Sequence, residues 1–122
     1  MADTIAPAIY KPVWVDLSSS DAAASRDFYA KLFGWKVDVE PDPKYGGYAQ
    51  ALIGDKVAAG IGPKMMAEAP TAWSIYIGTS NIAALMSKVQ DAGGKVIVPP
   101  MQVGDQGSMA VFQDPTGAFL SA

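Results

Sequence analysis

The feature that most constrains this chain is an internal repeat. Residues 21–37 align without a gap with residues 81–97, and each copy opens with a residue that favours helix N-caps, Asp21 or Asn81. Glycine closes the helix-like stretch in both copies. Similarity at one fixed offset indicates a duplicated supersecondary unit. We therefore expect two matching halves, with a cleft where the halves face each other.

Local patterns predict a strand, a helix and three further strands in each copy. In the second copy, the apolar residues Ile82, Leu85, Met86 and Val89 recur at helical spacing. Alternating β-branched residues bounded by turn residues predict the strands. Because tight turns join most strand pairs, we expect mixed or antiparallel pairing, and hence an α+β fold class. The expected elements span 13–17, 22–33, 35–40, 48–53 and 56–61, then 72–79, 82–92, 95–98, 108–113 and 118–122.

The length of 122 residues predicts a single domain, and half of the residues are apolar, which is enough for a core at this size. Within it, we expect a first module at about 11–62, a linker at 63–71 and a second module at about 72–122. The pair Pro99–Pro100 is expected to stop the strand at 95–98.

Two residue types are missing, and their absence excludes several chemistries. The sequence has no cysteine, which excludes disulfides, thiolate nucleophiles and zinc–thiolate sites. It also has no histidine, the usual general base near neutral pH and the commonest transition-metal ligand. A Ser-His-Asp triad therefore cannot be assembled from this chain. Any metal would need oxygen ligands, which favour magnesium or calcium.

The charge pattern argues against several partners. The net charge is −3 and the basic residues are scattered singly, so we expect no nucleic acid partner. The longest apolar stretches are strand-sized, so we expect no membrane span. The N-terminus has no basic region followed by an apolar run, which argues against a signal peptide. The cytoplasm is the expected compartment.

Two motifs and their order carry a resemblance to a known family. The segment Asp-Phe-Tyr-Ala-Lys-Leu-Phe-Gly-Trp at 27–35 follows a Val-Asp-Leu strand, and Val-Phe-Gln-Asp-Pro-Thr-Gly stands at 111–117. Over residues 11–122 the chain resembles the vicinal-oxygen-chelate superfamily, which includes glyoxalase I, bleomycin resistance proteins and extradiol dioxygenases. The resemblance implies two βαβββ modules whose mixed sheet curls around a cavity.

The resemblance also implies four metal-binding positions, usually histidine or glutamate in the family's enzymes. Counting from the motifs places these positions at Trp14, at Gly60 or Ile61, at Ser74 and at Ser121. None of these residues is a good metal ligand. We therefore expect the family fold without its metal chemistry, with no metal site and no other cofactor.

Strand alternation predicts which side chains line the cavity. The expected ligand-binding residues are Trp14, Asp16, Ser74, Tyr76, Phe119 and Ser121. Three aromatic rings with a few polar groups suit a small aromatic or hydrophobic molecule. Two other interpretations stay open. The aromatic side chains could simply fill the sheet interior, and Asp16 could cap a turn or bind the amides of Ser18–Ser20.

Two further groups of residues have open roles. Tyr45 and Tyr48 could sit on a mobile flap or in a plain hairpin loop. The methionines could form an adaptable lip over the cavity or pack in loops and core, at Met65, Met66, Met101 and Met109.

Three functions are consistent with these patterns. The first is a metal-free binding protein of the bleomycin resistance type. This function leaves open whether the chain is an enzyme. The second is a lyase, isomerase or oxygenase of the same superfamily, without metal or with a divalent ion, in which Asp16 is a general base of raised pKa and Tyr76 a donor. The third is a structural dimerisation module. We expect a homodimer, because a short final strand ending at Ala122 would invite pairing.

Overall fold

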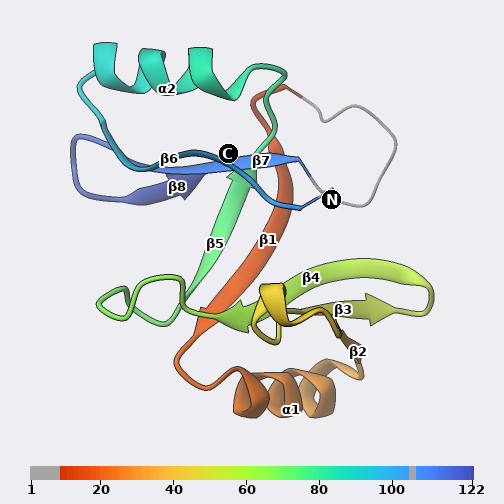
Figure 1. Ribbon diagram of the computed structural model, residues 1–122. Helices are drawn as coiled ribbons and strands as arrows, with labels where there is room; N and C mark the ends of the chain where they lie inside the picture. The colour runs from red at the N-terminus through yellow and green to blue at the C-terminus, as the bar shows by residue number, and fades with distance from the viewer. Residues whose placement is uncertain (1–8, 105–106) are drawn as a thin grey trace. The chain divides into compact units, whose positions relative to one another are not determined.

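The computed structural model describes residues 9–104 and 107–122 and has the α+β fold that the sequence predicts (Figure 1). An eight-stranded mixed sheet and two α-helices follow the order strand, helix, three strands, twice over. The first half contains β1 (Pro12–Ser19), α1 (Ala22–Phe33), β2 (Lys36–Val39), a 3₁₀ turn (Pro43–Tyr45), β3 (Ala49–Ile53) and β4 (Lys56–Pro63). The second half contains β5 (Ala72–Ile77), α2 (Ile82–Asp91), β6 (Lys95–Gln102), β7 (Ser108–Gln113) and β8 (Phe119–Ser121).

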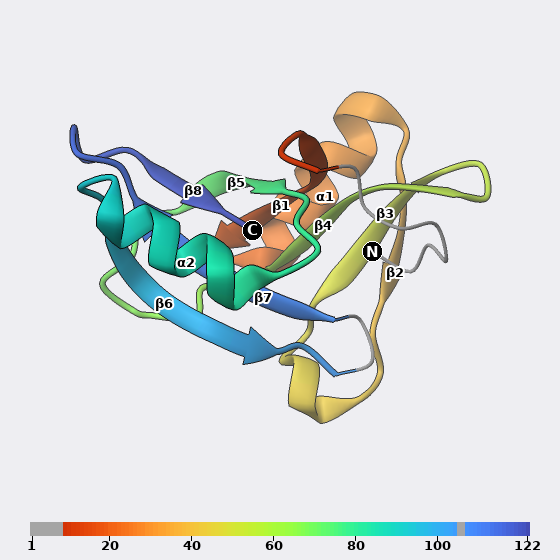
Figure 2. The same cartoon turned by 90° about the horizontal axis from the view of Figure 1, so that it is seen from above.

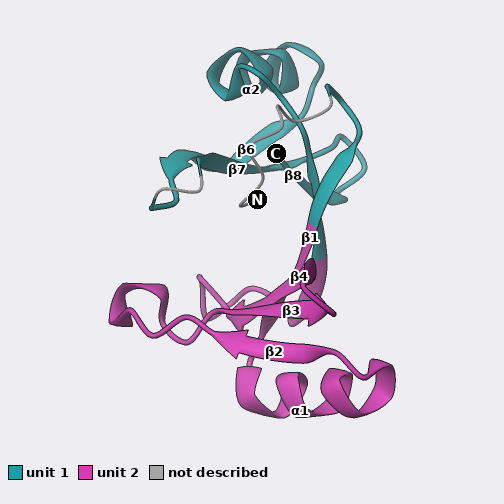
Figure 3. Ribbon diagram, turned by 90° about the vertical axis from the view of Figure 1, so that its right-hand side faces the viewer, with its two compact units in different colours: residues 1–14, 74–122 teal, residues 15–73 magenta. Residues whose placement is uncertain are grey.

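The chain divides into two compact units, which are coloured separately in Figure 3. Unit 1 comprises residues 1–14 and 74–122, and unit 2 comprises residues 15–73. The boundaries fall inside β1 and β5, so both strands run from one unit into the other. The division expected from the sequence, into modules on either side of a linker at 63–71, stays a prediction. β4 ends at Pro63, the first residue of that expected linker.

In unit 2, α1 lies on one side of the strands, which follow the order β2-β3-β4-β1 (Figure 3). β1 and β4 are parallel, and the remaining neighbours are antiparallel. Asp21 caps α1 by accepting a hydrogen bond of 3.1 Å from the backbone N–H of Ala24. The helix ends at Gly34, whose φ of 71° lies in the left-handed region that glycine adopts without strain.

In unit 1, α2 lies over β6 and β7 of a half-sheet with the order β5-β8-β7-β6 (Figure 2). Asn81 caps α2 through the backbone N–H of Ala84, at 3.0 Å. The core of this unit forms under the helix, around the buried residues Met86, Ala110 and Ala122. Partly buried apolar side chains complete it, namely Ile82, Leu85, Val89, Val96 and Phe112.

The expectation that Pro99–Pro100 ends a strand is wrong. β6 continues through both prolines to Gln102, with register shifts between Val96 and Val98 and between Val98 and Met101. β6 stands at the end of the strand order, so no described strand pairs with one of its sides. Proline lacks the N–H donor and is tolerated at such an edge.

No helix among the described residues is long and apolar enough to cross a membrane.

Candidate functional site

Contact with α1 distinguishes the two faces of β1. The Oγ atoms of Ser19 and Ser25, the latter on α1, lie 2.7 Å apart. Ser19 and Leu17 are both buried and, two residues apart on a strand, share the face that meets the helix. Asp16 therefore lies on the opposite, helix-free face. In the parallel ladder between β1 and β4, Asp16 stands directly opposite Gly60.

The ring of Tyr48 covers this part of the helix-free face in unit 2. The Tyr48 hydroxyl donates a hydrogen bond to Asp16 Oδ2 at 3.4 Å. A Cβ atom added to Gly60 would overlap Tyr48 Oη and Cζ, and one added to Gly62 would lie 2.7 Å from Tyr48 Cδ2. The phenol thus occupies the space that side chains at positions 60 and 62 would need.

The sequence reasoning did not find this role for Tyr48, which it assigned to a flap or a hairpin loop. The residue stands directly before β3, whose first residue, Ala49, pairs with Ile61 of β4. The sequence Gly60-Ile61-Gly62 could have indicated this role, because it places two glycines on one face of a strand. Two glycines on one face of a strand leave a groove, and a ring from the neighbouring strand often fills it.

The helix-free face of unit 1 follows from the strand register. Ala110 and Ala122 pack under α2, so their neighbours Val111 and Ser121 face the other way. Val111 pairs with Ser121 across β7 and β8, and Tyr76 pairs with Ser121 across β5 and β8. Val111, Ser121 and Tyr76 therefore share the helix-free face.

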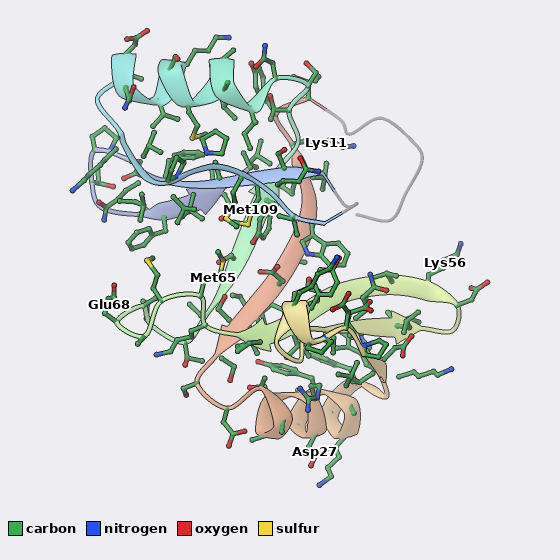
Figure 4. The ribbon with its side chains drawn as sticks, viewed as in Figure 1. Lys11, Asp27, Lys56, Met65, Glu68 and Met109 are labelled. Carbon is green, nitrogen blue, oxygen red and sulfur yellow. The ribbon has the colours of Figure 1, made fainter. Side chains whose placement is uncertain are left out.

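The side chains of this face differ in burial. Tyr76 and Ser121 are buried, and Ser74, two residues before Tyr76, is half-buried. Met109 is also buried and points away from α2 (Figure 4). Phe119 shares the alternation of Ser121 but is 58% exposed.

The placement of the six expected ligand-binding residues agrees with the alternation from which they were chosen. Trp14 and Asp16 share one face of β1, while Ser74, Tyr76, Phe119 and Ser121 share the helix-free face of unit 1. Asp16 lies in unit 2 and the other five lie in unit 1. Their roles in binding or catalysis stay predictions.

The Asp16 carboxylate accepts a hydrogen bond from Tyr48, and its alternative role at a turn stays a prediction. The N-cap of α1 is Asp21, whose backbone N–H also donates to Ser19 Oγ at 3.0 Å. Through its bond to Tyr48, the Asp16 carboxylate is tied to an aromatic residue of the helix-free face.

The donors at the four family metal positions do not fit a divalent ion. Trp14 brings an indole, Ser74 and Ser121 bring neutral hydroxyls, and neither Gly60 nor Ile61 brings a side-chain donor. The phenol of Tyr48 fills the space above Gly60. Among residues 9–104 and 107–122, no three Asp or Glu side chains gather closely enough to hold a metal.

A pocket of about 470 Å³ lies on the other face of β1, beside the start of α1 in unit 2. Several of its polar groups have partners, because Ser19 bonds to Ser25 and Thr71 Oγ1 accepts from the Ser20 N–H at 3.1 Å. Asp16 is not among its lining residues. They are Leu17, Ser19, Ser20, Asp21, Ala24, Ser25, Phe28, Tyr29, Thr71, Ala72 and Trp73.

Similar sequences include proteins from actinomycetes. Over 124 residues the chain is 41% identical to the anthracycline biosynthesis protein DnrV of Streptomyces peucetius, covering 90% of this chain and 45% of that protein. Over 113 residues it is 39% identical to the putative glyoxylase CFP32 of Mycobacterium tuberculosis, covering 89% of this chain and 43% of that protein. The chain thus spans less than half the length of these relatives.

Solved structures share the fold at low sequence identity. A Streptomyces coelicolor methylmalonyl-CoA epimerase variant matches with a TM-score of 0.62 and 19% identity, over 93% of each chain. A superfamily member from Vibrio splendidus matches with a TM-score of 0.56 and 16% identity, over 88% of this chain and 93% of that one.

The sequence model of one family matches nearly the whole chain, over residues 11–121. The duplicated strand–helix–strand order, the two motifs and the fold all agree with that match. The chain belongs to the glyoxalase/bleomycin resistance protein/dioxygenase superfamily.

Proposed function

We propose that this chain binds a small aromatic or otherwise hydrophobic molecule without a resident metal ion. The observation that supports the proposal is the residue types at the four positions that the family resemblance gives for metal ligands. None of them is a good metal ligand: Trp14, Gly60 or Ile61, Ser74 and Ser121. The space beside Gly60 is also filled, because the Tyr48 phenol lies where a side chain at position 60 would be. A metal-binding side chain at position 60 would therefore clash with Tyr48.

The chemistry of the helix-free faces supports a flat ligand with polar edges. Trp14 and Tyr76 offer ring surfaces for stacking, and Ser74 and Ser121 offer hydroxyls for orientation. Small-molecule sites typically combine an apolar lining with a few polar groups in this way. One relative is named an anthracycline biosynthesis protein, which supports an aromatic ligand.

Tryptophan fluorescence tests the proposal with quinizarin, a dihydroxyanthraquinone, as the probe. We expect saturable quenching at one site per chain in the wild-type protein. Trp14→Ala should raise Kd at least about tenfold, a loss of roughly 1.4 kcal/mol of binding free energy. Trp35→Phe is the matched control, because Trp35 packs against Tyr29 and Phe33 beside α1. Linear, unsaturable quenching, or equal Kd values in wild type and Trp14→Ala, would contradict the proposal.

A second candidate is a metal-free enzyme, favoured by the hydrogen bond from Tyr48 to Asp16. In this scheme, the Asp16 carboxylate removes a proton from an acidic carbon of an aromatic ketone. The resulting enolate takes a proton from water, and Asp16 gives its proton to the hydroxide that is left, which restores the carboxylate. Anthrone in D₂O is a suitable probe, because its methylene protons exchange by this route. Exchange accelerated by the wild type and lost in Asp16→Asn would support the enzyme. Equal exchange rates with both proteins would exclude Asp16 as the base.

A further inference from the structure

The pocket beside the start of α1 lies within unit 2 and shares no residue with the proposed ligand site. Its volume of about 470 Å³ falls in the range of about 300–1,000 Å³ that is usual for small-molecule sites. It lies on the face of β1 that meets the helix, where the side chains of Leu17 and Ser19 are buried. A molecule bound here would therefore be separate from one bound on the helix-free faces.

The pocket exists because small side chains leave space between β1 and the first turns of α1. Ser19, Ala24 and Ser25 line it there, and none of their side chains is larger than a hydroxymethyl group. Ala24 stands one helical turn before Phe28, and Ser25 stands one turn before Tyr29. The aromatic rings therefore begin where the small side chains end.

Three aromatic rings form walls of the pocket. Tyr29 meets Phe28 with ring planes at 85° and centroids 4.9 Å apart, and it meets Trp73 at 79° and 5.2 Å. Trp73 Nε1 donates a hydrogen bond of 3.0 Å to the Tyr29 hydroxyl, which holds these two rings in place. Walls that meet near right angles surround a compact, rounded group, whereas a flat molecule would stack on one ring alone.

The charge of the lining is negative. Asp21 lines the pocket, and no lysine or arginine is among the described residues that line it. Within the described residues, Asp21 makes no ion pair, and Lys64 donates inside its own loop, to the carbonyl groups of Ala67 and Ala69. The start of a helix attracts anions, but the Asp21 carboxylate already supplies one by accepting from the Ala24 N–H. The lining therefore favours a cation.

The carboxylate and the rings are close enough for one small ligand to meet both. Phe28 follows Asp21 by two turns of α1, which is about 10 Å along the helix axis. Because helical side chains lean back toward the N-terminus, the Phe28 ring lies closer to Asp21 than its Cα does. Aromatic faces attract ammonium groups through their quadrupole, and tryptophan does so most strongly.

We propose that this pocket binds a small organic cation with a methylated ammonium group. The rings of Phe28, Tyr29 and Trp73 surround the cationic head, and the Asp21 carboxylate balances its charge. Phe28 is 56% exposed and Trp73 is 37% exposed, so ring surface is accessible to such a ligand. The inference is independent of the proposed function, because the pocket shares no residue with the proposed ligand site.

Choline tests the site, and its uncharged control is neohexyl alcohol, in which a tert-butyl group replaces the trimethylammonium group. The indole N–H signal of Trp73 in heteronuclear NMR spectra reports binding, since this N–H bonds to Tyr29. We expect a saturable shift with choline and a Kd at least about tenfold higher for neohexyl alcohol, which lacks the charge. Sodium chloride at equal concentration controls for ionic strength. Equal Kd values for the two probes, or no saturation below about 50 mM choline, would overturn the proposal.

Three variants locate the binding, with folding checked by circular dichroism. Asp21→Asn removes the charge but keeps the helix cap, so the Kd for choline should rise about threefold while that for neohexyl alcohol stays the same. Phe28→Leu keeps an apolar side chain without an aromatic face and should raise the Kd for choline at least about threefold. Leu32→Ala, on the same helix but outside the lining, is the matched control and should leave both Kd values unchanged. A Kd for choline that is unchanged in both Asp21→Asn and Phe28→Leu would place the binding elsewhere and contradict the proposal.

Discussion

At the scale of single residues, two glycines of β4 determine what surrounds Asp16. Gly60 pairs with Asp16, and both Gly60 and Gly62 lie under the ring of Tyr48. A family enzyme would need a donor near this place, whereas here a phenol takes the space and bonds to the carboxylate. Both the residue types at these positions and the packing of Tyr48 therefore argue against a metal ion here.

Gly60→Ala should destabilise the fold by about 1–3 kcal/mol, the usual cost of forcing extra volume into a packed site. The added Cβ would overlap the Tyr48 ring, so the ring must move and its bond to Asp16 must break. Urea denaturation gives the free energy of unfolding. In a Tyr48→Ala background the same substitution should cost clearly less, because the obstructing ring is absent. Equal costs in the two backgrounds would show that Tyr48 does not occupy this space.

Asp114 has a lowered pKa, and its environment makes the cause testable. Its carboxylate accepts a side-chain hydrogen bond from Thr116, the largest contribution, and backbone bonds from Ala118 and Thr116. Since the pKa falls on folding, the carboxylate stabilises the native turn at neutral pH. That contribution is lost as the pH falls through the folded-state pKa.

Thr116→Val should therefore move the pKa of Asp114 upward, toward its ordinary value, because the hydroxyl donor is removed. NMR titration of the Asp114 carboxyl carbon measures the shift. Thr116→Ser, which keeps the hydroxyl, is the conservative control. An Asp114 pKa that is identical in the wild type and Thr116→Val would assign the lowering to the backbone bonds.

At the scale of secondary structure, helices were easier to predict than strand ends. Asp21 and Asn81 cap the two helices as their sequence positions predict, because an N-cap depends on residues within one turn. Pro99–Pro100 misled the prediction because only the strand order reveals that β6 lies at an edge. A local sequence pattern therefore predicts an N-cap, but it does not predict which strand lies next to another in the sheet.

The apolar face of α2 is predicted to contribute strongly to the free energy of unfolding. Met86 is 5% exposed and packs with Ala110 and Ala122, so Met86→Ala should lower the free energy of unfolding by about 2–5 kcal/mol. Ser87→Ala on the exposed side of the same helix should change stability by less than about 0.5 kcal/mol. Urea denaturation compares the two. Similar losses in both variants would contradict the assignment of the buried face.

The candidate site was predictable only in part, for a related reason. Strand alternation placed Trp14 beside Asp16, and Tyr76 with Ser121, because a period of two is intrinsic to a strand. The contact of Tyr48 with Asp16 joins residues on different strands through the register of β3, β4 and β1. Register is set by pairing across the sheet and cannot be read from one segment.

At the scale of the whole molecule, the duplication gives two units with the same order of strands and helix but with different side chains on their surfaces. Each unit has a helix on one face of its half-sheet, and the residues proposed to bind the ligand lie on the other face. The outer flank of α1, where Phe28 and Leu32 are exposed, is separate from these faces.

The central claim is tested most directly by isothermal titration of quinizarin into metal-stripped protein. The protein is treated with EDTA, its metal content is verified by mass spectrometry, and the titration is repeated with excess Mg²⁺ and with excess Mn²⁺. We expect one site per chain with the same Kd, within about twofold, in all three titrations, because no donor of the chain would bind the ion. Binding that requires an added ion, or a metal that stays at one equivalent after EDTA, would contradict the account.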